Sequence, residues 1–188
     1  MKLSANDIRV GHILNFHDKL WVVLKTQHTK PGKGGAYMQV EMKGLLEGGK
    51  TNHRFRSSET VEKVSLEEKE HQYLYYDGEN YIFMDPVSFE QVQFGKDFIG
   101  DSVVYLKDNM MISVLFYEEK PISIKLPDTV VMEVREADAV VKGQTASSSY
   151  KPAVLENNQR VLVPPHIEAG MRIVVNTADG TYVEREKD

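Results

Sequence analysis

The chain of 188 residues is 41% hydrophobic and 27% charged, and it contains no cysteine. This composition is typical of a folded globular protein, and it excludes disulfides, thiolate metal sites and cysteine nucleophiles. The N-terminus lacks the apolar segment of a signal peptide, and the longest apolar stretch, at 110–117, is too short to span a bilayer. We therefore expect a cytoplasmic protein without a membrane segment.

The formal net charge of −5 is distributed unevenly along the chain. Residues 1–65 contain 11 Lys and Arg against 6 Asp and Glu, residues 66–127 contain 5 against 12, and residues 128–188 contain 7 against 10. One basic end on an otherwise acidic chain favours an oriented approach to a polyanion such as nucleic acid. The alternative interpretation is that the uneven charge is chance variation of the surface and has no binding role.

The first 65 residues are predicted to fold into short strands, because β-branched and aromatic residues alternate with polar ones and no helical period is sustained. Five strands in so short a segment favour a small closed barrel, which leaves no exposed edge. The expected strands are residues 10–16, 20–27, 37–42, 50–56 and 60–64.

The segment between the second and third strands, residues 29–36, contains one proline, three glycines and no large apolar residue. Such a segment turns sharply and has nothing to bury, so it predicts the exposed tip of a hairpin. Lys33 lies at this tip between two glycines, where a stiff stem would carry its ammonium into a narrow, phosphate-lined cavity. A lysine that serves only solubility is the alternative. The residues expected to support the tip are Lys30, Pro31, Gly32, Gly34 and Gly35.

Four basic residues on the strands around this hairpin are candidate contacts to an RNA backbone, since contacts to phosphate groups fix the register of a protein on nucleic acid. Each of them alone has the character of ordinary surface charge. They are Lys25, Lys43, Arg54 and Arg56.

Residues 66–127 are predicted to form a second β module. Asp77-Gly78 between two apolar strands is a strong hairpin signal, and the segment 86–100 has room for a short helix. Pro121 and Pro127 bracket the last strand and mark a boundary. The expected strands are residues 72–76, 81–84, 103–106, 110–117 and one between the two prolines.

Residues 128–188 are predicted to form a third β module, whose strands are separated by turn clusters such as Asp179-Gly180 and by a polar loop at 142–151. The inferred architecture is all-β, with three consecutive small β-barrel modules at 1–65, 66–127 and 128–188. The last two are expected to be five-stranded barrels of the oligonucleotide-binding kind. The expected strands of the third module are residues 130–134, 153–155, 161–163, 173–175 and 182–183.

One segment, residues 44–51, satisfies the phosphate-binding pattern G-x-x-x-x-G-K-[ST]. That motif needs a helix that begins at its Lys-Thr, so that the helix N-terminus faces the phosphates. Residues 52–58 alternate as a strand does instead, and the chain has no βαβ pattern. We expect a glycine-rich turn here, and a P-loop nucleotide hydrolase is the least favoured alternative.

The six histidines predict no metal site, because His12 and His17 have no third ligand near them. No G-x-S-x-G occurs, and no serine has histidine and acidic partners in a recognisable context. We therefore expect no enzymatic activity, no cofactor and no metal.

The lysine loop at residues 31–36 resembles the lysine-tip loop of the bacterial elongation factor P family. The Lys-Pro-Ala of 151–153 and the run Val-Leu-Val-Pro-Pro-His-Ile-Glu-Ala-Gly of 161–170 look like the C-terminal signature of that family, and the likeness continues through 173–177 and 180–185. It extends over essentially the whole chain. The resemblance implies a KOW/SH3-like N-terminal barrel followed by two OB-fold barrels.

The resemblance also implies a translation factor that binds the 70S ribosome between the peptidyl-tRNA and exit sites and promotes peptide-bond formation at consecutive prolines. By position, Lys33 is the lysine that the family carries towards the CCA end of the P-site peptidyl-tRNA, initiator or prolyl. The implied partners are that tRNA, ribosomal RNA and, because many members carry a β-lysyl group on this lysine, a lysine-modifying ligase. A monomer without membrane contact is expected, and whether Lys33 is modified stays open.

Two positions depart from the family pattern. Asn158 stands where the family usually has glycine, and asparagine also tolerates a left-handed backbone. A bulkier Ser-Ser-Ser-Tyr run at 147–150 replaces a segment that is often rich in glycine, in a loop that lies near the small subunit and the exit-site codon in the family. The candidate residues of this mRNA-facing loop are Gln144, Thr145, Ser147, Ser148, Ser149, Tyr150 and Lys151.

A generic single-stranded RNA-binding protein built from barrel modules is the other alternative. It would need aromatic residues for base stacking on an exposed basic sheet. The acidic second and third modules argue against this alternative.

Overall fold

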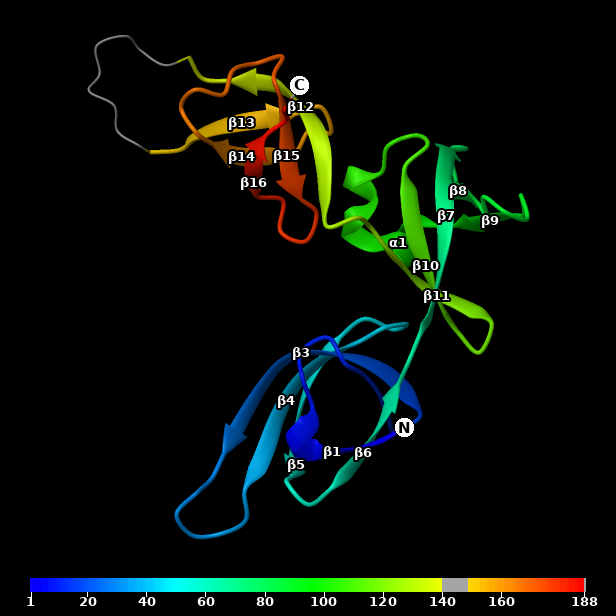
Figure 1. Cartoon of the computed structure of the whole chain (residues 1–188), viewed down its shortest axis with the longest axis vertical. Helices are drawn as coiled ribbons and strands as arrows, with labels where there is room; N and C mark the ends of the chain where they lie inside the picture. The colour runs from blue at the N-terminus through cyan, green and yellow to red at the C-terminus, as the bar shows by residue number, and fades with distance from the viewer. Residues whose placement is uncertain (140–148, 188) are drawn as a thin grey trace. The chain divides into compact units, whose positions relative to one another are not determined.

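The computed structural model describes residues 1–139 and 149–187. Strands predominate in this part of the chain, and its helices are short (Figure 1). The chain divides into two compact units, Met1–Glu68 with Leu115–Ser123 and Lys69–Val114 with Ile124–Asp188. The all-β prediction is confirmed, whereas the module boundaries after residues 65 and 127 stay a prediction.

The first unit contains a six-stranded sheet in the order β1-β6-β2-β3-β4-β5. Ile8, Leu14 and Val40 are fully buried in its core. The strand expected at 10–16 begins only at Ile13, because the preceding residues form a turn in which the His12 N–H donates to the Arg9 carbonyl. The elements are β1 (Lys2–Ser4), η1 (Ala5–Asp7), β2 (Ile13–Phe16), β3 (Lys19–Thr29), β4 (Tyr37–Gly44), β5 (Lys50–Arg56) and β6 (Thr60–Val64).

A second, five-stranded sheet has the order β11-β10-β7-β8-β9. The predicted hairpin at Asp77-Gly78 is confirmed: β7 pairs antiparallel with β8, and the Asp77 carboxylate accepts hydrogen bonds from the N–H groups of Glu79 and Asn80. The elements are β7 (Glu67–Tyr76), β8 (Tyr81–Met84), β9 (Gln91–Phe94), α1 (Lys96–Ile99), η2 (Gly100–Tyr105), β10 (Met111–Tyr117) and β11 (Lys120–Lys125).

Residues 103–106 do not form the strand that the sequence predicted. Residues 103–105 are the end of the 3-10 helix η2, and Leu106 is its C-cap, whose N–H donates to the Val103 carbonyl. Tyr105 packs against the core of the third sheet. The β-branched Val103 and Val104 favour a strand by propensity, but packing of the segment overrides that preference.

The third sheet has the order β14-β13-β12-β15-β16. Its core includes Val134, Val163 and Ile173, all fully buried. Asn158 has φ of 66°, so it adopts the left-handed backbone that the sequence predicted for it. The strands are β12 (Thr129–Ala137), β13 (Lys151–Leu155), β14 (Arg160–Val163), β15 (Arg172–Asn176) and β16 (Tyr182–Arg185).

Candidate nucleic-acid interface

The lysine loop lies at the end of a hairpin that a third strand braces along its length. β3 and β4 pair without interruption from Lys25↔Glu41 to Thr29↔Tyr37, and β5 follows β4 as far as the pair Tyr37↔Arg56. Figure 1 shows the loop at the free end of the β3–β4 hairpin. Because backbone hydrogen bonds continue to the last pair before the loop, the stem holds the loop at a fixed position in the first unit.

The loop itself, residues 30–36, presents its lysines to solvent. Residues 30–35 are all exposed, and within the described part of the chain the Lys33 ammonium takes part in no hydrogen bond or ion pair. Gly34 has φ of 111°, a conformation that other residues rarely adopt, while a Cβ there would meet only Pro31 Cγ, at 4.0 Å. Glycine is therefore required at position 34 because of its backbone conformation, since a side chain there would have enough space.

The four predicted backbone contacts share the outer face of the β3–β4–β5 sheet. On β4 the alternate residues Met38, Val40 and Met42 are buried, so the residues between them point outwards. Residues directly opposite one another in a sheet lie on the same face. Lys25 opposes Glu41, Arg54 opposes Gln39 and Arg56 opposes Tyr37. The register thus brings Lys25, Lys43, Arg54 and Arg56 together as one cationic surface, which we call the outer basic face.

A hollow of about 610 Å³ opens on this face directly below the loop, lined by Gly35, Ala36, Tyr37, Arg54, Arg56, Ser57, Ser58 and Glu59. The Arg54 guanidinium carbon lies 4.2 Å from the centre of the Tyr37 ring, a cation–π contact that orients the arginine. The Ser57 hydroxyl is shielded from solvent and has no hydrogen-bond partner within the described residues. The two guanidiniums fit a phosphate group, although the Glu59 carboxylate also lines the hollow.

Two aromatic and two histidine side chains pack together elsewhere in the first unit. The Phe16 ring lies 4.0 Å from His17 and 4.6 Å from His53, and the His53 ring lies 4.4 Å from Phe55, all between ring centres. Among the described residues, no group of three His, Asp or Glu could hold a metal ion. His12 lies apart from this cluster, and burial, followed by the charges of Lys63 and Arg9, lowers its pKa.

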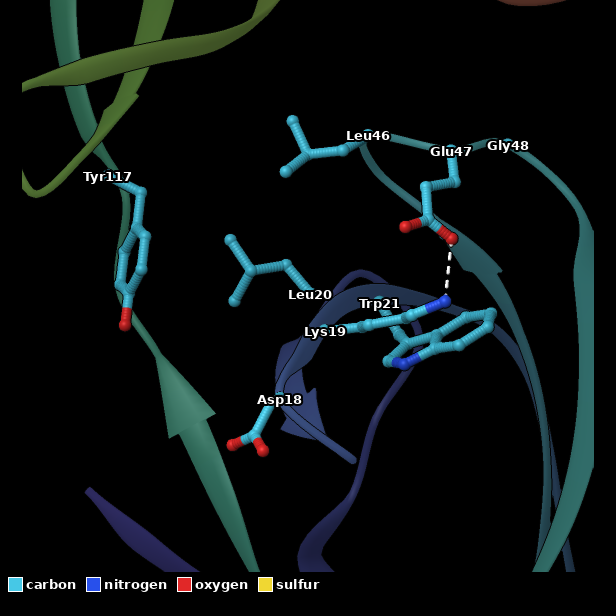
Figure 2. A pocket seen from close by; sticks show the side chains of 9 residues that line it. Asp18, Lys19, Leu20, Trp21, Leu46, Glu47, Gly48 and Tyr117 are labelled. Atoms are coloured by element: carbon cyan, nitrogen blue, oxygen red, sulfur yellow. Dashed lines mark hydrogen bonds and ion pairs between the residues drawn. The ribbon is translucent and has the colours of Figure 1, made fainter.

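The G-x-x-x-x-G-K-[ST] segment does not form a phosphate-binding loop. Lys50 and Thr51 begin the strand β5 instead of a helix, so the nucleotide-hydrolase alternative lacks the helix N-terminus that it requires. Gly44 is held close to the turn, since a Cβ at Gly44 would lie 2.7 Å from the Gly48 carbonyl oxygen. The segment instead contributes to an apolar pocket of about 210 Å³ between Trp21, Leu46 and Tyr117, with the Lys19–Glu47 ion pair on its rim (Figure 2).

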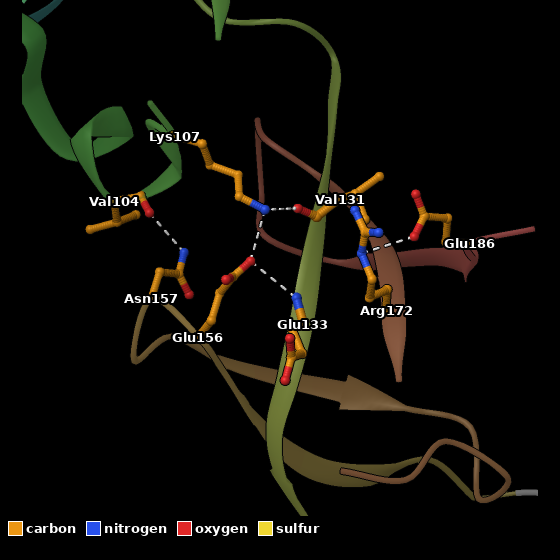
Figure 3. A network of polar contacts seen from close by, with 8 residues as sticks. All are labelled: Val104, Lys107, Val131, Glu133, Glu156, Asn157, Arg172 and Glu186. Carbon is orange, nitrogen blue, oxygen red and sulfur yellow. Dashed lines mark hydrogen bonds and ion pairs between the residues drawn. The ribbon is translucent and has the colours of Figure 1, made fainter. Parts of the chain in front are cut away.

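In the second unit, a polar network ties η2 and its following turn to the third sheet (Figure 3). Lys107 Nζ donates to the Val131 carbonyl at 2.8 Å and to Glu156 Oε1 at 2.9 Å, and the Glu133 N–H donates to the same carboxylate oxygen at 3.1 Å. Burial alone would raise the pKa of Glu156, but the bonds from Lys107 and Glu133, with the charges of Lys107 and Arg172, bring it below its usual value. This arrangement is structural, because Lys107 and Glu156 are paired with each other and with the backbone of β12.

The predicted mRNA-facing loop is described only at its end. Gln144, Thr145, Ser147 and Ser148 lie outside the described residues. Ser149 and Tyr150 are exposed, and the Tyr150 ring meets Tyr182 edge-on at 6.2 Å between centres. Lys151 is the first residue of β13, and its ammonium donates to the Asp138 carbonyl. Of these residues, Tyr150 is therefore the one with an exposed ring that can stack.

Sequence reasoning missed Tyr37 and Ser57, which line the hollow of the candidate interface. The register makes Tyr37 a neighbour of Arg54 and Arg56, and the Ser57 N–H donates to the Ala36 carbonyl at 3.0 Å, which fixes Ser57 beneath the loop. The period-two pattern of β4 contained the signal for Tyr37. Within the described residues, no helix is long and apolar enough to cross a membrane.

Comparison with known families accounts for nearly the whole chain. Residues 4–61 match the elongation factor P KOW-like domain, residues 66–124 the elongation factor P OB domain, and residues 130–185 the C-terminal domain of elongation factor P. Together with the all-β fold and the lysine hairpin, these matches define a translation elongation factor.

Curated relatives agree with this class. The chain is 58% identical over 185 residues to elongation factor P of Zymomonas mobilis, with 98% of this chain and 99% of the relative covered. It is 55% identical to elongation factor P of Brucella canis, with 98% and 100% covered. The chain belongs to the elongation factor P family, as the lysine loop and the C-terminal signature indicated.

A solved structure supports the fold independently. Eukaryotic translation initiation factor 5A from Methanococcus jannaschii superposes with a TM-score of 0.53 at 19% identity, over 68% of this chain and 94% of that chain. At this identity the likeness concerns the fold alone.

Proposed function

We propose that this protein binds the 70S ribosome beside the P-site peptidyl-tRNA, initiator or prolyl, and promotes peptide-bond formation where translation stalls at consecutive prolines. Lys33 reaches towards the CCA end of that tRNA. The observation that carries the proposal is an ammonium without a partner among the described residues, displayed on a glycine loop at the end of a hairpin braced by a third strand. Membership of the elongation factor P family supports the same role.

The mechanism that we infer is positioning, with the chemistry left to ribosomal RNA. Proline is a stiff and poorly placed nucleophile, and holding two reactants in attack geometry contributes up to about 7–11 kcal/mol in well-oriented systems. Only part of that amount is needed to relieve a stall. A lysine cation near the CCA end also attracts the phosphates of that segment, and the protein itself needs no general base or nucleophile.

The outer basic face supplies the docking surface in this proposal. Arg54 and Arg56 bind a phosphate in the hollow below the loop. Lys25 and Lys43 hold adjacent backbone. Such contacts position the protein on the nucleic-acid backbone without reading base sequence.

The same exposure makes Lys33 accessible to a lysine-modifying ligase. The loop has glycine on both sides of Lys33 and no bulky neighbour over its side chain, so an enzyme active site can enclose it. A β-lysyl extension would lengthen the reach of the side chain and keep its positive charge. We place the protein in the cytoplasm, as a monomer that is not itself an enzyme.

The test is a reconstituted translation system that makes a peptide with consecutive prolines. We expect Lys33→Ala to abolish the relief of stalling, because the variant keeps the stem and the outer basic face but has no ammonium at the tip. Lys50→Ala is the matched control, since Lys50 lies on the same sheet and is already within 3.9 Å of Glu41 Oε1. Undiminished relief by Lys33→Ala would contradict the mechanism.

A further inference from the structure

The turn between β8 and β9 exposes two apolar side chains that the fold does not use. Residues 85–90 connect Met84 to Gln91, which pair across the hairpin. Val87 is 85% exposed and Phe89 is 69% exposed. Within the described residues, Phe89 makes no ring contact. Phe89 therefore adds nothing to the core of the second sheet.

The backbone of Phe89 is strained as well. Its φ is 61°, in the left-handed region, where a bulky residue is a clear outlier and asparagine or glycine is favoured. Asparagine at this position would relieve the backbone strain, and its polar side chain would be better hydrated than the exposed phenylalanine ring. Folding alone therefore does not explain a phenylalanine here, and strain at an exposed position is a reason to look for a binding role.

Hydrogen bonds preorganise the turn around Asp85. The Asp85 carboxylate accepts from the N–H groups of Val87 at 2.8 Å and Ser88 at 3.2 Å. The Phe89 N–H donates to the Asp85 carbonyl at 2.9 Å, and the Asp85 N–H donates to the Glu90 carbonyl at 2.9 Å. The aromatic ring is thus presented on a rigid support, which lowers the entropic cost of binding through it.

The charge of this part of the chain decides between possible partners. Residues 66–127 contain 12 Asp and Glu against 5 Lys and Arg, and the turn itself contains Asp85 and Glu90 with no basic residue. An RNA backbone would be repelled, and so would the same acidic module of a second copy of this chain. A basic protein surface is attracted instead.

We propose that Phe89, with Val87 beside it, inserts into an apolar pocket on a positively charged protein. An aromatic anchor on a rigid support, surrounded by charge that complements the partner, is the usual composition of a binding hot spot. This inference rests on the proposed ribosomal function, which makes the partner a protein component of the ribosome. The interface is separate from the lysine loop, so the two can be tested apart.

The test replaces Phe89 with the photo-crosslinker p-benzoylphenylalanine in the full chain, bound to purified 70S ribosomes that hold a P-site peptidyl-tRNA. We expect a crosslink to one ribosomal protein of net positive charge. The same crosslinker at Tyr75, an aromatic residue that is 50% exposed on the same acidic module, is the control and should give no such product. A crosslink to ribosomal RNA, to tRNA or to a second copy of this chain, or no crosslink, would overturn the proposal.

Affinity gives a second readout. Phe89→Asn should fold at least as well as the parent, because asparagine accepts the left-handed backbone, yet raise the Kd for ribosomes about ten-fold. Phe89→Tyr keeps the ring and should stay near the parent value. An unchanged Kd in Phe89→Asn contradicts the inference.

The two proposals fail in different ways. If the parent relieves stalling and Lys33→Ala does not, but Phe89 gives no protein crosslink, only this inference is wrong. If the parent protein does not bind ribosomes at all, this inference and the proposed function are both wrong.

Discussion

Lys33 and Lys107 carry the same ammonium in opposite surroundings. Lys107 Nζ donates to the Val131 carbonyl on β12 and to the Glu156 carboxylate in the turn after β13 (Figure 3). Lys33 has no partner among the described residues and stands on a glycine loop. The network around Lys107 joins η2 and its following turn to the third sheet within the second unit. Lys107 is already paired within the chain, whereas the ammonium of Lys33 is free to meet the outside partner that we propose for it.

The largest effect that should distinguish the lysine hairpin from the Lys107 network is on ribosome binding by the outer basic face below the loop. We expect the double variant Arg54→Ala/Arg56→Ala to bind ribosomes about 10–100-fold more weakly than the parent. Loss of the phosphate that the two arginines share should lower the slope of log K against log salt by about 0.7 to 0.9. Titration at several salt concentrations measures this slope. Lys50→Ala, on the same face but close to Glu41, is the control and should change the slope less.

The next effect concerns stability. Lys107→Ala removes a donor from Glu156 and from the Val131 carbonyl, so we expect a loss of about 1–2 kcal/mol in the free energy of unfolding. The estimate is low because both side chains of this ion pair are partly exposed, at 38% and 40%. Denaturant titration measures the change. A variant as stable as the parent would show that the network contributes nothing.

A smaller effect of the same network depends on pH. Because the pKa of Glu156 is lowered in the folded chain, the unfolded chain binds the proton more readily in acid, and stability rises with pH. The contribution is complete above the unfolded value near 4.5 and is lost as pH falls through the lower folded pKa. The stability difference between the parent and Lys107→Ala should therefore shrink between neutral pH and about pH 3.5. A constant difference would contradict this assignment.

Much of the fold follows from sequence, because strands with strong alternation and clear turns are locally determined. The predicted strands 50–56, 60–64 and 81–84 have the bounds of β5, β6 and β8. The strands β1 and β9 escaped prediction. β1 has only three residues, and β9 lies in the segment 86–100, which the sequence analysis left open for a short helix.

The lysine loop was predictable for a local reason, because the spacing of its glycines is visible in the sequence. The outer basic face could not be predicted from local sequence in this way. A β-bulge between Val23 and Lys25 shifts the register, so that Lys25 opposes Glu41. Simple alternation from the buried Val23 would have turned Lys25 towards the core. Which cations share a face thus depends on pairing between distant segments.

The most direct measurement compares Lys33→Ala and Lys107→Ala side by side, by unfolding free energy and by synthesis through consecutive prolines. Our account predicts that Lys33→Ala keeps its stability within about 0.5 kcal/mol and loses its activity, while Lys107→Ala loses stability and keeps its activity. Full activity in a well-folded Lys33→Ala protein would contradict the account.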